Sequence, residues 1–151
     1  MKADNIRKAT DADIPAMMHI RSAVRENKLS NPDQVTFEHY VDFIRTGEMW
    51  VWEEDNHLLG FSAADARADS KWPGSIWALF AGPEHEGKGI GQALLARACG
   101  SLERAGYDTA KLSTAPASRA ARFYNRAGWS ENGYTDDGQI IFKCPLPAPA
   151  L

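Results

Sequence analysis

Two spacings of apolar residues divide the chain into helices and strands. Apolar residues three and four positions apart predict helices over about residues 11–27, 36–46, 91–105 and 118–127. Runs of aromatic and branched residues between turn signals predict strands near 5–9, 49–53, 58–64, 75–81, 108–114, 129–135 and 139–143. The pattern therefore predicts a fold of the α/β class, with a mixed sheet (α+β) of six to seven strands and about four helices.

Turn residues between these strands predict how the strands pair. Glu54-Asp55-Asn56 joins two strands into a hairpin, and Asp136-Asp137-Gly138 closes a second hairpin. A helix separates strand 75–81 from strand 108–114, so these two should be parallel neighbours with a right-handed crossover. We expect the rest of the sheet to be mostly antiparallel, and a ligand cleft to lie where the carboxyl ends of the parallel pair meet.

Length and composition indicate one soluble domain. The 151 residues are 44% hydrophobic, 25% charged and carry a formal net charge of −3, which gives no general attraction to nucleic acid or to an anionic membrane. We expect the domain to span 1–144, and the proline-rich tail 145–151 to leave the sheet and be loose. Two cysteines are too few for a disulfide framework and no apolar stretch approaches a membrane span, so we expect a cytoplasmic protein.

Residues 79–92 combine the end of a strand, a glycine-rich loop and the start of a helix. Gly87, Gly89 and Gly91 alternate, which lets backbone N–H groups converge without side chains in the way. The following helix presents its positive dipole end at the same place. Together these features predict an anion site built from main-chain amides, most suitably for a phosphate.

Two common phosphate loops do not fit this stretch. Gly82 and Gly87-Lys88 begin like a Walker A loop, but Gly89 stands where a Ser or Thr hydroxyl must hold magnesium. The dinucleotide pattern G-x-G-x-x-G fails because Gln92 or Leu94 occupies the last glycine position. A magnesium-independent pyrophosphate site is the interpretation that fits.

The segment 118–129 is the second informative stretch. Ser118 can cap a short helix, Gly128 can end it, and Trp129 begins the next strand. Three arginines at 119, 122 and 126 share one side of this helix, where they either meet a phosphate or form a solvated basic face.

The two stretches, in this order, resemble the GNAT superfamily of N-acetyltransferases. The loop Glu86-Gly87-Lys88-Gly89-Ile90-Gly91 is similar to the family's Gln/Arg-x-x-G-x-G/A pattern except in its first residue. The later segment is similar to the element A-x-x-F-Y-x-x-x-G-F/W, at Ala120, Phe123, Tyr124, Gly128 and Trp129. The resemblance covers nearly the whole chain except the tail, and implies the family's central mixed sheet with a parallel strand pair at the cofactor cleft.

The resemblance implies acetyl-CoA as acetyl donor and direct transfer to a primary amine in a ternary complex. The pyrophosphate of acetyl-CoA would lie on the amides of Gly87 to Gln92, and the pantetheine arm of acetyl-CoA would lie along Leu79 to Ala81. A main-chain N–H near Phe80 or Ala81 would polarise the thioester carbonyl. Tyr124 corresponds to the family's tyrosine that protonates the leaving thiolate. The implied cofactor-binding residues are Leu79, Phe80, Ala81, Glu86, Gly87, Lys88, Gly89, Ile90, Gly91 and Gln92.

The first residue of the glycine loop departs from the family pattern. Glu86 stands where Gln or Arg is usual, and a carboxylate close to a pyrophosphate would repel it. We therefore expect the Glu86 side chain to turn to solvent while the backbone binds the phosphates.

The sequence does not identify the general base that deprotonates the acceptor amine. Candidates are Glu26, Asp65, Glu84 and His85. The four histidines are scattered singly, so no metal site is expected, and no G-x-S-x-G nucleophile motif is present. Cys99 falls on the apolar side of its helix, which disfavours a covalent cysteine intermediate.

Other functions remain open at the level of sequence. One is a non-catalytic acyl-CoA sensor or partner-binding module that keeps the phosphate site, and another is a binding protein for a different nucleotide. The acceptor is a small-molecule or peptide amine of unidentified class, and exposed sheet edges allow a homodimer.

Overall fold

The computed structural model describes residues 5–23, 36–46, 48–82 and 88–148. Its helices are α1 (Ile14–Ala23), α2 (Phe37–Thr46), α3 (Ile90–Arg104) and α4 (Arg119–Arg126), and a 3-10 turn, η2 (Asp11–Asp13), precedes α1. Its strands are β1 (Ile6–Lys8), β2 (Met49–Glu54), β3 (His57–Asp65), β4 (Ser75–Ala81), β5 (Thr109–Thr114), β6 (Ser130–Tyr134) and β7 (Ile140–Pro145). The predicted set of helices and strands is confirmed. The stretch 24–27 of the expected first helix lies outside the described residues.

The strands form one mixed sheet in the order β1-β2-β3-β4-β5-β7-β6. Every neighbouring pair is antiparallel except β4 and β5, which run parallel. The predicted parallel pair therefore lies inside the sheet, with α3 as its crossover connection.

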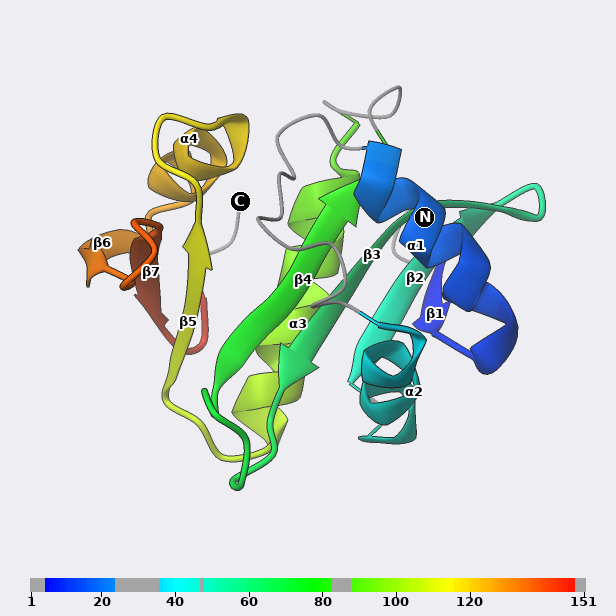
Figure 1. The fold of residues 1–151 in the computed structure, drawn as a ribbon, viewed down its shortest axis with the longest axis horizontal. Coiled ribbons are helices and arrows are strands. Elements are labelled where there is room, and N and C mark those ends of the chain that lie inside the picture. The colour runs from blue at the N-terminus through cyan, green and yellow to red at the C-terminus, as the bar shows by residue number, and fades with distance from the viewer. Residues whose placement is uncertain (1–4, 24–35, 47, 83–87, 149–151) are drawn as a thin grey trace.

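Helices cover both faces of the sheet (Figure 1). On one face, α1 and α2 pack on a cluster that includes Met17, Tyr40, Val51 and Phe61. On the other face, α3 packs across β2, β3 and β4, and α4 shares an apolar cluster with α3 and β7. The layers bury both sides of β4, as its almost continuous apolar sequence predicts.

Turns and caps follow the sequence signals. Asp55 and Asn56 have positive φ angles of 50° and 66°, the conformation that a two-residue hairpin turn requires. The Ser118 hydroxyl accepts a hydrogen bond from the Ala121 amide at 3.0 Å and caps α4, and Gly128 follows the helix with a φ of 88°.

One polar residue of α3 is buried, and the expectation that residue 145 leaves the sheet is wrong. Ser101 of α3 is buried, and its hydroxyl accepts a 2.9 Å hydrogen bond from the Trp50 indole. Strand β7 continues through Pro145, opposite Thr109, and the Leu146 amide donates to the Asp108 carbonyl at 2.9 Å. A proline at the end of a strand can pair because its missing N–H is not needed there.

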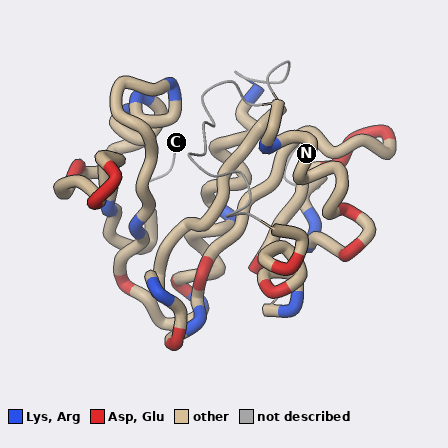
Figure 2. The backbone as a smooth tube through the Cα atoms, viewed as in Figure 1, with Lys and Arg blue, Asp and Glu red and all other residues tan. Residues whose placement is uncertain are grey.

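Charged residues are spread over the sheet and its helices, with basic positions on α4 and acidic positions at the turn between β6 and β7 (Figure 2). Among the described residues, no helix is both long and apolar enough to cross a bilayer.

Candidate functional site

Strands β4 and β5 pair at one end and then part. Ser75 lies opposite Lys111, and the Lys111 amide donates to the Gly74 carbonyl at 3.2 Å. Within the described strands no later residue of β4 has a β5 partner, although β4 continues to Ala81. The carboxyl end of β4 therefore offers main-chain groups on the side from which β5 has separated.

A bulge in β4 accompanies this separation. Ala64 pairs with Ile76 and Ala63 pairs with Ala78, so Trp77 is an extra residue in β4. A bulge bends its strand and changes which face each later side chain uses. After it, Phe80 packs with the α1/α2 cluster whereas Leu79 and Ala81 pack on the α3 side. The sequence pattern alone did not indicate this bulge.

The end of β4 leads toward the amino terminus of α3. Gly89 precedes α3 with a left-handed φ of 80°, and a Cβ there would meet no atom within 4 Å. The first turn of α3 contains no acidic residue, and its amides at Ile90, Gly91 and Gln92 have no acceptor within the helix. This end of α3 therefore fits an anionic group. Glu86 and Gly87, which the resemblance assigns to the cofactor site, lie outside the described residues.

Tyr124 is held in α4 by aromatic packing. Its ring lies 5.2 Å from Phe123, 5.5 Å from Trp129 and 5.6 Å from Phe142, measured between ring centres. The residue is 5% exposed, and burial, with a smaller contribution from neighbouring Cys99, raises the pKa of its phenol well above the usual value. A phenol in this environment keeps its proton at neutral pH.

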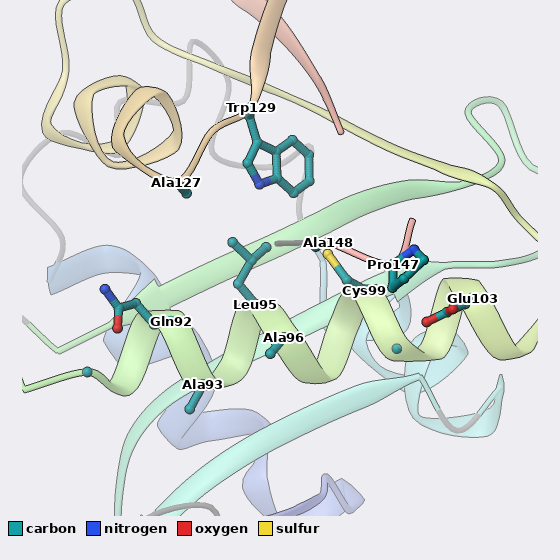
Figure 3. A pocket seen from close by; sticks show the side chains of 12 residues that line it. Gln92, Ala93, Leu95, Ala96, Cys99, Glu103, Ala127, Trp129, Pro147 and Ala148 are labelled. Carbon is teal, nitrogen blue, oxygen red and sulfur yellow. The ribbon is translucent and has the colours of Figure 1, made fainter. Parts of the chain in front are cut away.

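A groove of about 500 Å³ follows the exposed side of α3 (Figure 3). Gln92 lies near one end of it and Glu103 and Pro147 near the other, while the Trp129 ring points toward α3 from the opposite wall. The groove therefore begins at the same helix end as the anion site.

The two cysteines are buried and unpaired. Burial, with a smaller effect of Cys144, raises the pKa of the Cys99 thiol to about 12. Because the thiolate is the reactive form, Cys99 is a poor nucleophile, in agreement with the sequence expectation.

The structure disfavours Asp65 as the general base. Its carboxylate is bound by Arg67, with Nε to Oδ1 at 3.0 Å, and it lies opposite Ser75 at the far end of β4 from Ala81. The other candidates, Glu26, Glu84 and His85, fall outside the described residues. Within the described parts of the chain, no group of three His, Cys, Asp or Glu side chains is arranged to hold a metal ion.

Sequence reasoning did not single out Arg21. This arginine of α1 is only 9% exposed and lies against the rings of Trp77 and Phe80. Its position seven residues after Ile14 and four after Met17, on the apolar stripe of the helix, is the signal that could have indicated a buried arginine.

Comparisons with known proteins agree on one family. Residues 14–129 match the family described as the acetyltransferase (GNAT) family. No curated protein sequence gives a significant match.

Several solved structures share the fold. An N-acetyltransferase from Staphylococcus aureus Mu50 is 21% identical, with a TM-score of 0.75 over 93% of this chain and 97% of that one. The putative acetyltransferase yncA from Salmonella typhimurium, solved with acetyl-CoA, is 20% identical with a TM-score of 0.74 over 97% and 95%. The ribosomal-protein-S18-alanine N-acetyltransferase from Escherichia coli is 21% identical with a TM-score of 0.69 over 95% and 94%.

Proposed function

The chain belongs to the acetyltransferase (GNAT) family, and we propose that it moves an acetyl group directly from acetyl-CoA to a primary amine in a ternary complex. One observation carries the proposal. The end of β4 that has no β5 partner packs near the amino terminus of α3, where Ala81 lies against the cluster that contains Ile90, and α4 buries Tyr124. A phosphate-binding helix end, free main-chain groups and a protonated phenol are the parts that such a transfer needs.

The main chain supplies the proposed donor site. The amides of Gly87 to Gln92 would hold the pyrophosphate, supported by the left-handed Gly89 and the uncapped first turn of α3. Leu79, Phe80 and Ala81, at the end of β4 without β5 partners, would bind the pantetheine arm. The groove that starts at Gly89 and Gln92 gives room for the rest of the nucleotide. The yncA structure, which has acetyl-CoA bound in the same fold, supports this assignment.

The chemistry requires polarisation of the thioester and protonation of the leaving group. Acetyl-CoA supplies the activated acetyl group. A main-chain N–H near Phe80 or Ala81 would donate to the thioester carbonyl oxygen, which gains negative charge as the amine attacks. As the carbon–sulfur bond breaks, the Tyr124 hydroxyl would give its proton to the thiolate, and the proton that the attacking amine releases to water would restore the phenol. The raised pKa of Tyr124 keeps its hydroxyl protonated until the thiolate forms.

A thiol-release assay tests the proposal. Wild-type protein and acetyl-CoA are mixed with a panel of small amines, amino acids, aminoglycosides and peptide amino termini, and free CoA is measured. We expect at least one amine to release CoA together with one equivalent of acetylated product. If the protein binds acetyl-CoA but releases CoA with none of these amines, the result would instead support a non-catalytic acyl-CoA sensor.

The setting of the enzyme is a further proposal. Cys99 and Cys144 are both buried as free thiols, which suits a reducing cytoplasm.

Strand β6 forms an edge of the sheet with Tyr134 67% exposed, and it offers a surface on which two copies could pair.

A further inference from the structure

Two lysines lie directly opposite each other on neighbouring strands. Lys111 of β5 pairs with Lys143 of β7 in the antiparallel part of the sheet. Side chains at directly opposed positions have Cβ atoms about 5 Å apart, and like charges at such positions destabilise a sheet. Within the described residues neither lysine makes an ion pair. The two positive charges are therefore a feature that the stability of the sheet does not explain.

Both lysines project from the face of the sheet that lies opposite α3 and α4. Four residues that flank them in β5 and β7 are buried in the cluster with α3 and α4: Ala110, Leu112, Phe142 and Cys144. Because side chains alternate along a strand, the lysines face the other way. On that side α1 and α2 pack on β2, β3 and β4, and Figure 1 shows no helix of the described chain over β5 and β7. Strands β5 and β7 thus present an uncovered surface, on which Lys143 is exposed.

The carboxylates of the neighbouring elements do not neutralise this pair. Three of them, on the α2 side of the sheet, act on Arg67: Asp42, Asp65 and Asp69. Glu131 of β6 lies opposite Phe142 and therefore faces α4. Asp108 precedes β5 at a position that alternation also assigns to the α4 side. The uncovered surface of β5 and β7 is therefore positively charged, and an acidic partner complements it.

This surface lies on the side of the sheet that the proposed donor leaves free. The start of α3 and the groove along α3, which the proposed function assigns to acetyl-CoA, are on the opposite face. Lys111 lies opposite Ser75, the first residue of β4, whereas the thioester is assigned to Phe80 and Ala81 at the end of that strand. A strand rises about 3.3 Å per residue, so the lysine pair is roughly 20 Å from the reacting end. A small amine does not cover this distance, but roughly six residues of an extended peptide do.

We propose that Lys111 and Lys143 bind an acidic segment of a peptide or protein acceptor, whose amino terminus receives the acetyl group. The inference rests on the proposed acetyl transfer and adds to it the class of acceptor. Carboxylates between the two ammonium groups would offset their repulsion. The Nζ of Lys111 lies 5.6 Å from the centre of the Trp72 ring, which favours one position for this ammonium group. The acidic residues are expected at about positions four to seven of the acceptor.

Matched peptides test this inference. Peptides with the same amino-terminal residue carry Glu, Gln or Lys at about positions four to seven, and kcat/KM is measured by CoA release for each of several amino-terminal residues. We expect wild-type protein to favour the Glu peptide over the Gln peptide by about threefold or more. The gain should lie in KM with little change in kcat, because the lysines are far from the reacting atoms. High salt should reduce the preference, since the lysines are open to solvent.

Substitutions of the lysines give the second part of the test. Lys111→Gln and Lys143→Gln should each reduce the preference for the Glu peptide, and Lys143→Glu should reverse it in favour of the Lys peptide. The matched control is Lys8→Gln, at an exposed lysine of β1 on the opposite edge of the sheet, which should keep the wild-type preference. Because Lys143 is exposed, its variants decide the matter if Lys111→Gln does not fold.

The outcomes separate this inference from the proposed function. Rates that do not depend on peptide charge, an unchanged preference in Lys143→Glu, or acetylation of small amines and of no peptide would each overturn the role of the lysine pair and leave acetyl transfer standing. A wild-type dimer that becomes a monomer in Lys143→Glu would also overturn it, because a second copy would then cover this surface. Failure of every amine to release CoA would overturn both.

Discussion

Ser75 of β4 lies opposite Lys111 of β5, and the two strands separate after this pair. The same strand contains the extra residue Trp77, which turns Phe80 toward α1 and Leu79 toward α3. One short strand thus offers main-chain groups to the proposed donor on its open edge while its side chains pack on both helical layers.

Replacing Tyr124 tests the proposed acid. Tyr124→Phe should lower kcat by about 10²-fold, because removing a general acid costs a factor of this order. The Kd of acetyl-CoA should change little, since the phenol acts on the leaving thiolate. Stopped assays give kcat, and titration of the protein with acetyl-CoA gives Kd.

The matched control is Tyr134→Phe, which removes a hydroxyl from a side chain that is 67% exposed. It should leave kcat unchanged. Equal turnover in the wild type and in Tyr124→Phe would remove Tyr124 from the mechanism.

Two glycines at the start of α3 should respond differently to alanine. Gly89 has a φ of 80°, so Gly89→Ala should lower the free energy of unfolding by about 1–2 kcal/mol and weaken acetyl-CoA binding as the amides shift. Gly91 is helical and an added Cβ would meet only Phe123 Cζ at 4.0 Å, so Gly91→Ala should keep or raise stability by about 0.5–1 kcal/mol. Urea unfolding compares the two variants, and equal losses would contradict this description of the helix start.

The buried hydrogen bond between Trp50 and Ser101 predicts a stability effect. Ser101→Ala leaves the Trp50 indole N–H without its 2.9 Å acceptor inside the protein, and should cost about 1–3 kcal/mol in urea unfolding. Ser22→Ala removes an exposed hydroxyl from α1 and should change stability by no more than about 0.5 kcal/mol. A loss in Ser101→Ala no larger than in Ser22→Ala would show that this bond contributes little.

Asp13 should make stability sensitive to acid. Burial raises the pKa of the Asp13 carboxyl, but hydrogen bonds from Arg7 and from the Thr10 amide, at 2.8 Å each, outweigh burial and hold it below its usual value. A lowered folded-state pKa gives stability that is present above the unfolded-state pKa of about 3.9 and is lost as pH falls through the folded-state value.

Unfolding by urea at a series of pH values measures this dependence. Asp13→Asn should lower stability at pH 7 and flatten the decline below about pH 4. Asp11→Asn, at an exposed neighbour, should keep the wild-type decline. A wild-type slope in Asp13→Asn would show that another carboxylate causes the acid sensitivity.

Local signals in the sequence were sufficient for much of the fold. The Ser118 cap, the turn at Asp55 and Asn56 and the glycine after α4 each depend on a few adjacent residues, and the structure has all three. The glycine loop likewise predicted the start of α3, because Gly89 and the helix that follows are consecutive in sequence.

Features that depend on distant residues were not predicted. Ser101 is polar, but Trp50 reaches it from β2, so its burial could not be read from the pattern of α3. The extra residue Trp77 is apparent only from the pairing of β4 with β3. Arg21 looks like an ordinary helix residue until Trp77 and Phe80 are placed beneath it.

Binding of acetyl-CoA tests the central claim most directly. In a thermal-unfolding titration, acetyl-CoA at 100 times its Kd should stabilise the protein by about 2.7 kcal/mol, and ATP at the same concentration should give a much smaller shift. The site built by Gly89, Ile90 and Gly91 predicts this stabilisation without added metal. No shift at millimolar acetyl-CoA would contradict the proposed donor site and with it the proposed acetyl transfer.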